Sequence, residues 1–224
     1  MITVITPTAD RPQGIVHLAE YLERQTVQPT EWIIVDDGNE ATPIPSPPWC
    51  RMIKLKRQYE GSRSLANNLI TGLDAANPEH AIVICEDDDW YSPKHMEVSL
   101  RYLERYPATG CQYLQYYHIT NRSYRKMSNT GAALCQTALN PDMVESLRQS
   151  ALATLQNGDR NIDGTFWKSA PRQGLHNTQT VIGIKGIAGR KGIGIGHRPD
   201  RRWAHDPQGR VLRDWIGDDV ERYL

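Results

Sequence analysis

Four acids, Glu86, Asp87, Asp88 and Asp89, stand together directly after the apolar run 81–85. Crowded carboxylates repel one another and raise each other's pKa unless a cation compensates their charge. Their oxygens are hard ligands that suit a divalent ion such as Mg²⁺ or Mn²⁺. The apolar run predicts a buried strand of a parallel sheet, and ligands bind at the carboxyl ends of such strands. We therefore expect a metal site in this loop; the alternative is a solvated acidic loop.

A glycine-rich basic stretch in the C-terminal third is the second feature that could do chemistry. It has glycines at 183, 186, 189, 192, 194 and 196, and its cations are Lys185, Arg190 and Lys191, followed by His197, Arg198, Arg201 and Arg202. Each glycine destabilises a helix or strand by about 0.5–1 kcal/mol, so a mobile loop is predicted. Backbone N–H groups and basic side chains donate to phosphate oxygens. We expect the loop to close over a phosphate group; the alternative is a flexible tail.

The hydrophobic pattern predicts the elements that position these residues. Strands are expected at 2–5, 32–35, 52–55 and 81–85, and helices at 13–24, after Gly61, and from Ser92-Pro93 as N-cap and first residue. This order predicts an α/β sheet with crossover connections. Neither a dinucleotide fingerprint nor a P-loop is present. Beyond 106, a strand is expected at 112–119, a helix from Asn140-Pro141, a short helix at 161–167, a strand at 180–184 and a short helix after Pro207.

Composition sets the outer limits. The chain has 224 residues with 26 Lys and Arg against 26 Asp and Glu, which suits one domain and gives no global field for nucleic acid or an anionic membrane. The four cysteines are widely spaced and form no metal or redox pair, as in a reducing compartment. No leader or membrane-spanning stretch is recognisable. We expect a cytoplasmic protein without a membrane partner.

The motifs in their order resemble a known family. The segment 5–8 with Arg11, the segment 35–38, Asn67-Asn68 and the segment 86–90 are similar to motifs of the nucleotide-sugar-dependent glycosyltransferases of GT-A fold, in their family-2-like group. The resemblance covers residues 1–106 well. It implies a doubly wound, mostly parallel central sheet with helices on both faces and a smaller acceptor-side subregion. It also implies one domain in three parts: a donor-binding half (1–106), an acceptor and catalytic half (107–182), and a basic lid with the tail (183–224).

The resemblance implies a role for each matching residue. The metal would be held by Asp88, with Glu86 as its partner, Asp89 in support and His197 as a further ligand or else a solvated loop residue. Asp36 or Asp37 would accept a hydrogen bond from a base such as uracil. The donor-binding set is Thr6, Pro7, Thr8, Arg11, Asp36, Asp37, Arg63, Asn67, Asp87, Lys185, Arg190 and Lys191.

Catalysis in the family uses a carboxylate base that deprotonates the acceptor hydroxyl. Asp163 is the candidate, and Asp159 competes for the role; helix N-capping is the alternative role for Asp163. The resemblance thus implies a metal-dependent glycosyltransferase that uses Mn²⁺ or Mg²⁺ and a nucleotide-sugar donor, a UDP-sugar. Its acceptor would be a glycan or nucleic acid, such as a hydroxymethylated DNA base. A sugar nucleotidyltransferase and a non-catalytic nucleotide-sugar or nucleic-acid binding module are the alternatives.

Overall fold

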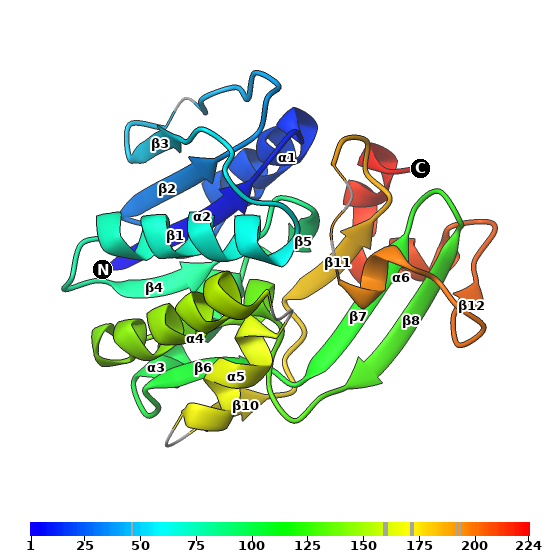
Figure 1. Cartoon of the computed structure of the whole chain (residues 1–224). Helices are drawn as coiled ribbons and strands as arrows, with labels where there is room; N and C mark the ends of the chain where they lie inside the picture. Colours follow the sequence, from blue (N-terminus) through cyan, green and yellow to red (C-terminus); the bar gives the residue numbers. More distant parts are fainter. Residues whose placement is uncertain (46, 159–160, 171–172, 191, 193) are drawn as a thin grey trace.

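Two β-sheets organise the computed structural model, which describes residues 1–224 except 46, 159–160, 171–172, 191 and 193 (Figure 1). The larger sheet has the strand order β10-β6-β9-β4-β1-β2-β3. Its strands are β1 (Ile2–Thr8), β2 (Glu31–Asp36), β3 (Cys50–Lys54), β4 (Ala81–Ile84), β6 (Ala108–Cys111), β9 (Ala138–Leu139) and β10 (Gln173–His176). The strands β1 to β4 run parallel, and only β9 is antiparallel to its neighbours. This confirms the mostly parallel sheet predicted from the sequence.

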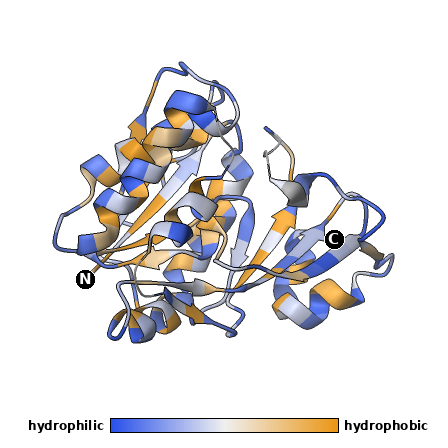
Figure 2. Ribbon diagram, turned by 60° about the horizontal axis from the view of Figure 1, so that its bottom comes forward, coloured by the Kyte–Doolittle hydropathy of each residue, from blue (hydrophilic) through white to orange (hydrophobic). Residues whose placement is uncertain are grey.

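The apolar runs form the centre of this sheet. β1 lies between β2 and β4, with Ile5 opposite both Ile33 and Ile84. All three side chains are fully buried, as expected for strands covered on both faces. Figure 2 shows hydrophobic residues concentrated along these strands, whereas the helices alternate between hydrophobic and hydrophilic positions.

Helices cover both faces of the larger sheet. One face carries α1 (Pro12–Glu23) and α3 (His95–Leu103), which pack on Val4 and Val83. The other face carries α2 (Ser62–Ala75), α4 (Val144–Asn157) and α5 (Ile162–Ser169), which pack on Ile5 and Ile82. The alternation of inward positions along each strand therefore builds two separate hydrophobic clusters.

The smaller sheet has the order β12-β8-β7-β11-β5 and lies beside the carboxyl ends of the central strands (Figure 1). Its strands are β5 (Asp89–Tyr91), β7 (Tyr113–His118), β8 (Ser123–Ser128), β11 (Val181–Lys185) and β12 (Ala204–His205). The remaining helices are α6 (Arg210–Ile216) and the 3₁₀ helices η1 (Leu134–Gln136), η2 (Pro141–Met143), η3 (Ile195–His197) and η4 (Gly217–Arg222). Among the described residues, no helix is long and apolar enough to cross a bilayer.

Two predicted boundaries were wrong. α3 begins at His95 and not at Ser92-Pro93, because the backbone N–H of Ser92 donates to Thr180 at 2.9 Å and so continues the pairing of β5 with β11. The predicted glycine-rich loop begins later than expected, because β11 continues through Gly183 to Lys185. Gly183 fits there since its Cα faces the ring of Tyr116, where a Cβ would lie only 2.4 Å away.

Candidate active site

The ends of the central strands and the second sheet enclose a cavity of about 370 Å³. Its lining includes residues from the end of β1 and the loop after it, the start of α2, the acid loop 86–89 and the described part of the segment 185–197. Further lining residues come from 133–135 and from the start of α5. The parallel register aligns the carboxyl ends of β1, β2 and β4 at one edge of the sheet, which is why these loops meet.

The acid loop is held in place by neighbouring elements. Asp87 accepts a hydrogen bond from the Thr8 hydroxyl, and the Glu86 N–H donates to the Tyr91 hydroxyl at 2.7 Å. Behind the loop, the Trp90 indole N–H donates to Asp219 at 2.6 Å. Trp90 and Tyr91 therefore anchor the loop.

Two cations, the partly buried Arg11 and the buried Lys185, pair with the acid loop. Arg11 lies 2.6 Å from Asp87 and 2.8 Å from Asp88. The ammonium of Lys185 lies 3.0 Å from Asp88 and 2.7 Å from Asp89, and it is almost completely buried. The sequence predicted both cations for donor binding; the structure adds that both are ion-pair partners of the acids.

The carboxylates of the acid loop differ in proton affinity. Burial, together with the nearby carboxylates of Asp89 and Asp88, raises the pKa of Glu86 to about 8. Burial also raises the pKa of Asp87 to about 6, although Arg11 opposes this. For Asp88, burial is outweighed by Lys185 and Arg11, which hold its pKa well below the ordinary range. Asp88 is therefore the carboxylate of this loop whose ionised form is favoured most by its surroundings.

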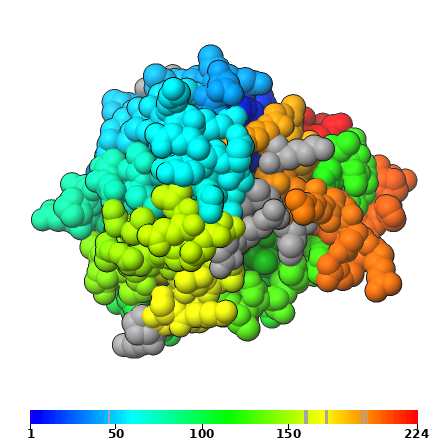
Figure 3. All heavy atoms as spheres, viewed as in Figure 1, coloured from blue at the N-terminus to red at the C-terminus, as the bar shows by residue number. Residues whose placement is uncertain are grey.

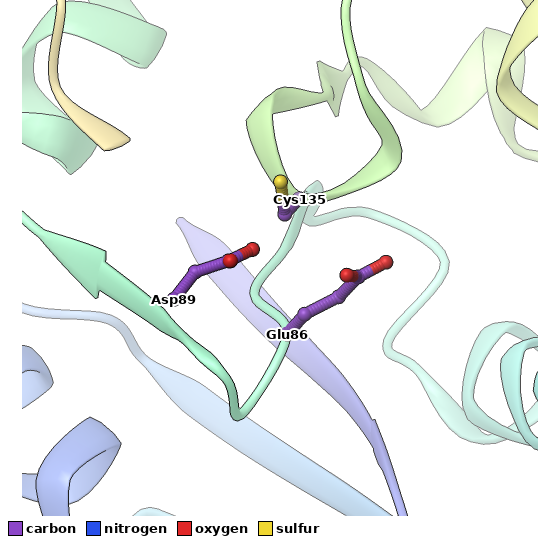
Figure 4. Close-up of side chains that lie close together, drawn as sticks. All are labelled: Glu86, Asp89 and Cys135. Atoms are coloured by element: carbon purple, nitrogen blue, oxygen red, sulfur yellow. The ribbon is translucent and has the colours of Figure 1, made fainter. Parts of the chain in front are cut away.

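The donor atoms in this region fit a divalent ion. Oδ2 of Asp88 lies 2.8 Å from the guanidinium of Arg11 and 3.1 Å from Nε2 of His197. Neighbouring ligand atoms of an octahedral ion bound at about 2.1 Å lie about 3 Å apart, so Oδ2 of Asp88 and Nε2 of His197 are spaced as ligands. Ligand atoms of Glu86, Asp89 and Cys135 also lie within 4.8 Å of one another. Figure 4 shows these three side chains close together. Cys135 carries no local signal that connects it with the acids, because 46 or more residues separate it from them in the sequence.

The described residues of the glycine-rich segment line the cavity from the side of the second sheet. The Arg190 backbone N–H donates to Asp10 at 3.2 Å, and its guanidinium reaches Ser64 at 3.2 Å and Glu60 at 2.6 Å. Figure 3 accordingly shows the cyan start of α2 next to the orange residues that follow β11. Glycine is required at Gly189, where φ is +108° and a Cβ would meet the Asp10 carbonyl at 2.2 Å. The predicted donor residue Lys191 lies outside the described residues.

The acids after β2 lie behind the cavity wall. Asp36 accepts hydrogen bonds from the Gly38 N–H at 2.7 Å and from Lys54 at 2.8 Å. Asp37 accepts from Ser64 at 2.7 Å and from Asn68 at 3.1 Å. Their carboxylates are buried and do not belong to the described lining of the cavity.

Some predicted donor residues face the cavity and others face away from it. Pro7, Thr8, Arg11, Lys185 and Arg190 line it. Outside this lining, Thr6 accepts a hydrogen bond from the Trp32 indole at 2.9 Å, Arg63 donates to the Gln156 carbonyl at 3.2 Å, and the Asn67 carbonyl accepts from Thr71.

Asn68 lines the cavity where the sequence had indicated Asn67. The signal that could have identified it is the i, i+4 spacing of Ser64 and Asn68, which puts both on one helix face. Tyr116 and Cys135 are further lining residues outside the predicted set.

Asp163 lies in the first turn of α5 and lines the cavity opposite the lid. It is not the N-cap, which is Asn161. Burial raises the pKa of Asp163, which suits a group that must accept a proton. The competing candidate Asp159 lies outside the described residues.

Sequence comparison finds glycosyltransferases. The model of the family described as glycosyl transferase family 2 matches residues 3–170, more than half of the chain. A Bacillus subtilis (strain 168) protein, the uncharacterized glycosyltransferase YwdF, is 29% identical over 105 residues, which are 46% of this chain and 38% of YwdF.

Structure comparison finds the same kind of fold. TarS of S. aureus, residues 1–349 in complex with UDP-GlcNAc, is similar with a TM-score of 0.60 at 12% identity, over 89% of this chain and 61% of TarS. The complex of the same TarS fragment with UDP gives a TM-score of 0.58 at 12% identity, over 82% of this chain and 60% of that chain. The chain thus spans less than two thirds of the length of these relatives. At this identity the likeness shows the GT-A fold alone.

Proposed function

The chain belongs to glycosyl transferase family 2, and we propose that it moves a sugar from a nucleoside diphosphate, specifically UDP, to an acceptor hydroxyl. The observation that carries the proposal is the meeting of three groups around one cavity: the acid loop, the basic lid and Asp163. The crystal structures of TarS with UDP and UDP-GlcNAc support a uridine donor. We assign donor binding to residues 1–106, acceptor binding and catalysis to 107–182, and the lid and tail to 183–224.

The diphosphate of the donor would lie between the cations and the acid loop. Arg11, Lys185 and Arg190 all reach the cavity, and their N–H groups are suitable donors to phosphate oxygens. Members of the family are generally associated with a divalent metal. Asp88 and His197 would hold the ion, Mn²⁺ or Mg²⁺, with Glu86 and Asp89 beside them. Such an ion offsets the negative charge that develops on the leaving diphosphate.

Asp163 would act as the base in an inverting transfer. Its carboxylate accepts the proton of the acceptor hydroxyl while that oxygen forms a bond to the anomeric carbon. The bond from the anomeric carbon to the diphosphate oxygen breaks, and the electron pair leaves with the nucleoside diphosphate. The lid excludes water during this step, because Arg190 bridges to the start of α2.

The acceptor would approach along a basic strip, defined as Arg125, Lys126, Arg198, Arg201 and Arg202. β12 pairs with β8, which brings the two halves of this strip side by side next to the lid. All but Arg125 are exposed, and Asp200 is the acid that pairs with Arg202 and approaches Arg125. The net charge of zero hides this local excess. It favours a phosphate-bearing acceptor such as nucleic acid over a neutral glycan.

Measurements of donor binding and turnover test the proposal. The purified protein is incubated with UDP-, GDP-, CDP- and ADP-sugars and Mn²⁺, and nucleoside diphosphate release and donor affinity are followed. We expect ion-dependent binding of a UDP-sugar, with slow hydrolysis when no acceptor is present. Asp88→Asn should abolish the ion dependence, whereas Asp74→Asn, an exposed acid on α2, should retain it. If none of the donors binds or turns over, the protein is not this enzyme, and binding without turnover would favour the non-catalytic module.

A further inference from the structure

The carboxylate of Asp88 is shared among three basic side chains. Its Oδ1 lies 3.0 Å from the ammonium of Lys185, and its Oδ2 lies 2.8 Å from Arg11 and 3.1 Å from His197. Asp88 and Lys185 are at most 6% exposed at their side chains, so water screens little of this charge. Both oxygens of the proposed metal ligand therefore already face fixed positive charge.

Lys185 is held between the acids by the sheet. β11 pairs with β5 so that Gly183 lies opposite Asp89, and with β7 so that Lys185 lies opposite His118. The Ile184 N–H donates to the carbonyl of Asp88 at 3.1 Å. The ammonium of Lys185 lies 2.7 Å from Asp89 and 5.8 Å from the centre of the Tyr116 ring. This lysine cannot swing away as a surface lysine can.

The position of Lys185 has a consequence for the ion. An ion at Asp88 and His197 would stand close to two cations that repel it. The donor's diphosphate removes this repulsion, because its oxygens bind both the ion and the cations of the cavity. We propose that Lys185, together with Arg11, repels a lone divalent ion at Asp88 and so makes the ion bind together with the diphosphate. This inference rests on the proposed function and adds that the divalent ion and the diphosphate enter the site together.

Mn²⁺ binding to the whole protein tests the inference without any turnover. Free Mn²⁺ is measured by electron paramagnetic resonance in three titrations: with the protein alone, with the protein and UDP, and with the protein and inorganic pyrophosphate. Pyrophosphate is the probe that lacks the nucleobase and the ribose. We expect either anion to raise the affinity of the wild-type protein for Mn²⁺ at least tenfold. By linkage, Mn²⁺ must raise the affinity for UDP by the same factor.

Variants at Lys185 separate the effect of its positive charge on the ion from a purely structural role of its side chain. In Lys185→Met, Mn²⁺ alone should bind at least about tenfold more tightly than it binds to the wild type, since one repelling charge is gone. The factor by which UDP raises the affinity for Mn²⁺ should become smaller. Lys185→Arg should restore the coupling, and Lys94→Met, a change of an exposed lysine outside the cavity lining and the basic strip, is the matched control that leaves it unchanged. Loss of folding in Lys185→Met alone would leave the arginine variant and the wild-type coupling as the decisive measurements.

The outcomes distinguish this inference from the proposed function. Mn²⁺ binding that is equally tight with and without UDP or pyrophosphate overturns the inference while the glycosyltransferase proposal stands. Unchanged Mn²⁺ affinity in a folded Lys185→Met protein overturns it as well. Failure of UDP to bind under any ion condition contradicts the uridine donor itself.

Discussion

Gly14, in the first turn of α1, lies at the point where this helix meets the acid loop. A Cβ built on Gly14 would lie 2.4 Å from the backbone carbonyl oxygen of Asp87. Non-bonded heavy atoms pack at about 3.5 Å, so in Gly14→Ala the helix or the loop must move by about 1 Å. Backbone lies on both sides of the contact, and no side chain can rotate away to relieve it.

Two opposing contributions set the expected stability of Gly14→Ala. Alanine favours a helix over glycine by about 1 kcal/mol, whereas overpacking of this kind costs about 1–3 kcal/mol. Because the clash is with backbone, we take the upper part of that range and expect a net loss of about 1–2 kcal/mol. For a chain of this length that lowers Tm by about 2–8 °C.

Donor binding should weaken in the same variant. Arg11 stands one turn before Gly14 and contacts Asp87 and Asp88 at 2.6 and 2.8 Å, so a shift of about 1 Å breaks these contacts. We expect about tenfold weaker binding of UDP with Mn²⁺, which corresponds to about 1.4 kcal/mol. Urea unfolding and calorimetric titration measure the two effects.

A control in the same helical turn isolates the clash. Gln13 is exposed, and Gln13→Ala should stay within about 0.5 kcal/mol of the wild type with unchanged donor affinity. If Gly14→Ala is at least as stable as the wild type and binds UDP equally well, the close approach of α1 to the acid loop is not a constraint and the reasoning fails.

Three further perturbations address the base, the first loop and the basic strip. Asp163→Asn should keep donor binding and lose at least a hundredfold in transfer rate. In the wild type, the acidic limb of the pH–rate profile should lie above the ordinary pKa of Asp, because burial raises the pKa of Asp163. Full activity of Asp163→Asn would exclude Asp163 as the base. For Asp10, burial is outweighed by hydrogen bonds from an arginine and two backbone N–H groups, which lower its pKa to about 2. Its contribution to stability is therefore complete above about pH 4 and lost as the pH falls to about 2, so unfolding curves of wild type and Asp10→Asn should differ at pH 7 and converge at pH 2. Reversing the charge of the strip with Arg198→Glu and Arg201→Glu should weaken duplex DNA binding and flatten its salt dependence, while Lys94→Glu should not; binding that ignores all three changes would assign the acceptor elsewhere.

The sequence was sufficient to predict the donor-side half of the fold. The apolar runs that contain Ile5, Ile33 and Ile84 are unbroken and too short for helices, so buried parallel strands were the consistent interpretation. Once those strands are parallel, the acids that follow them must lie at one edge of the sheet. The position of the acid loop therefore followed from local patterns alone.

The second sheet depended on contacts that local patterns do not encode. β11 pairs with β7 and β5, which precede it by more than 60 residues, and β12 has only two residues. Gly183 was assigned to the loop because glycine disfavours a strand, whereas in the structure the ring of Tyr116 leaves no room for a Cβ at this strand position. The role of Lys185 as a buried ion-pair partner could not be predicted without that register, although its charge marked it as a candidate.

The acid loop and the lid are held in the structure by different numbers of contacts. Three elements fix the acid loop, through Thr8, Tyr91 and the backbone of Ile184. The lid is joined to the opposite wall mainly by the side chain of Arg190, and to Asp88 through His197. From these contacts we expect the acid loop to be preorganised and the contacts of Arg190 and His197 to open after transfer, and we expect this opening to limit turnover.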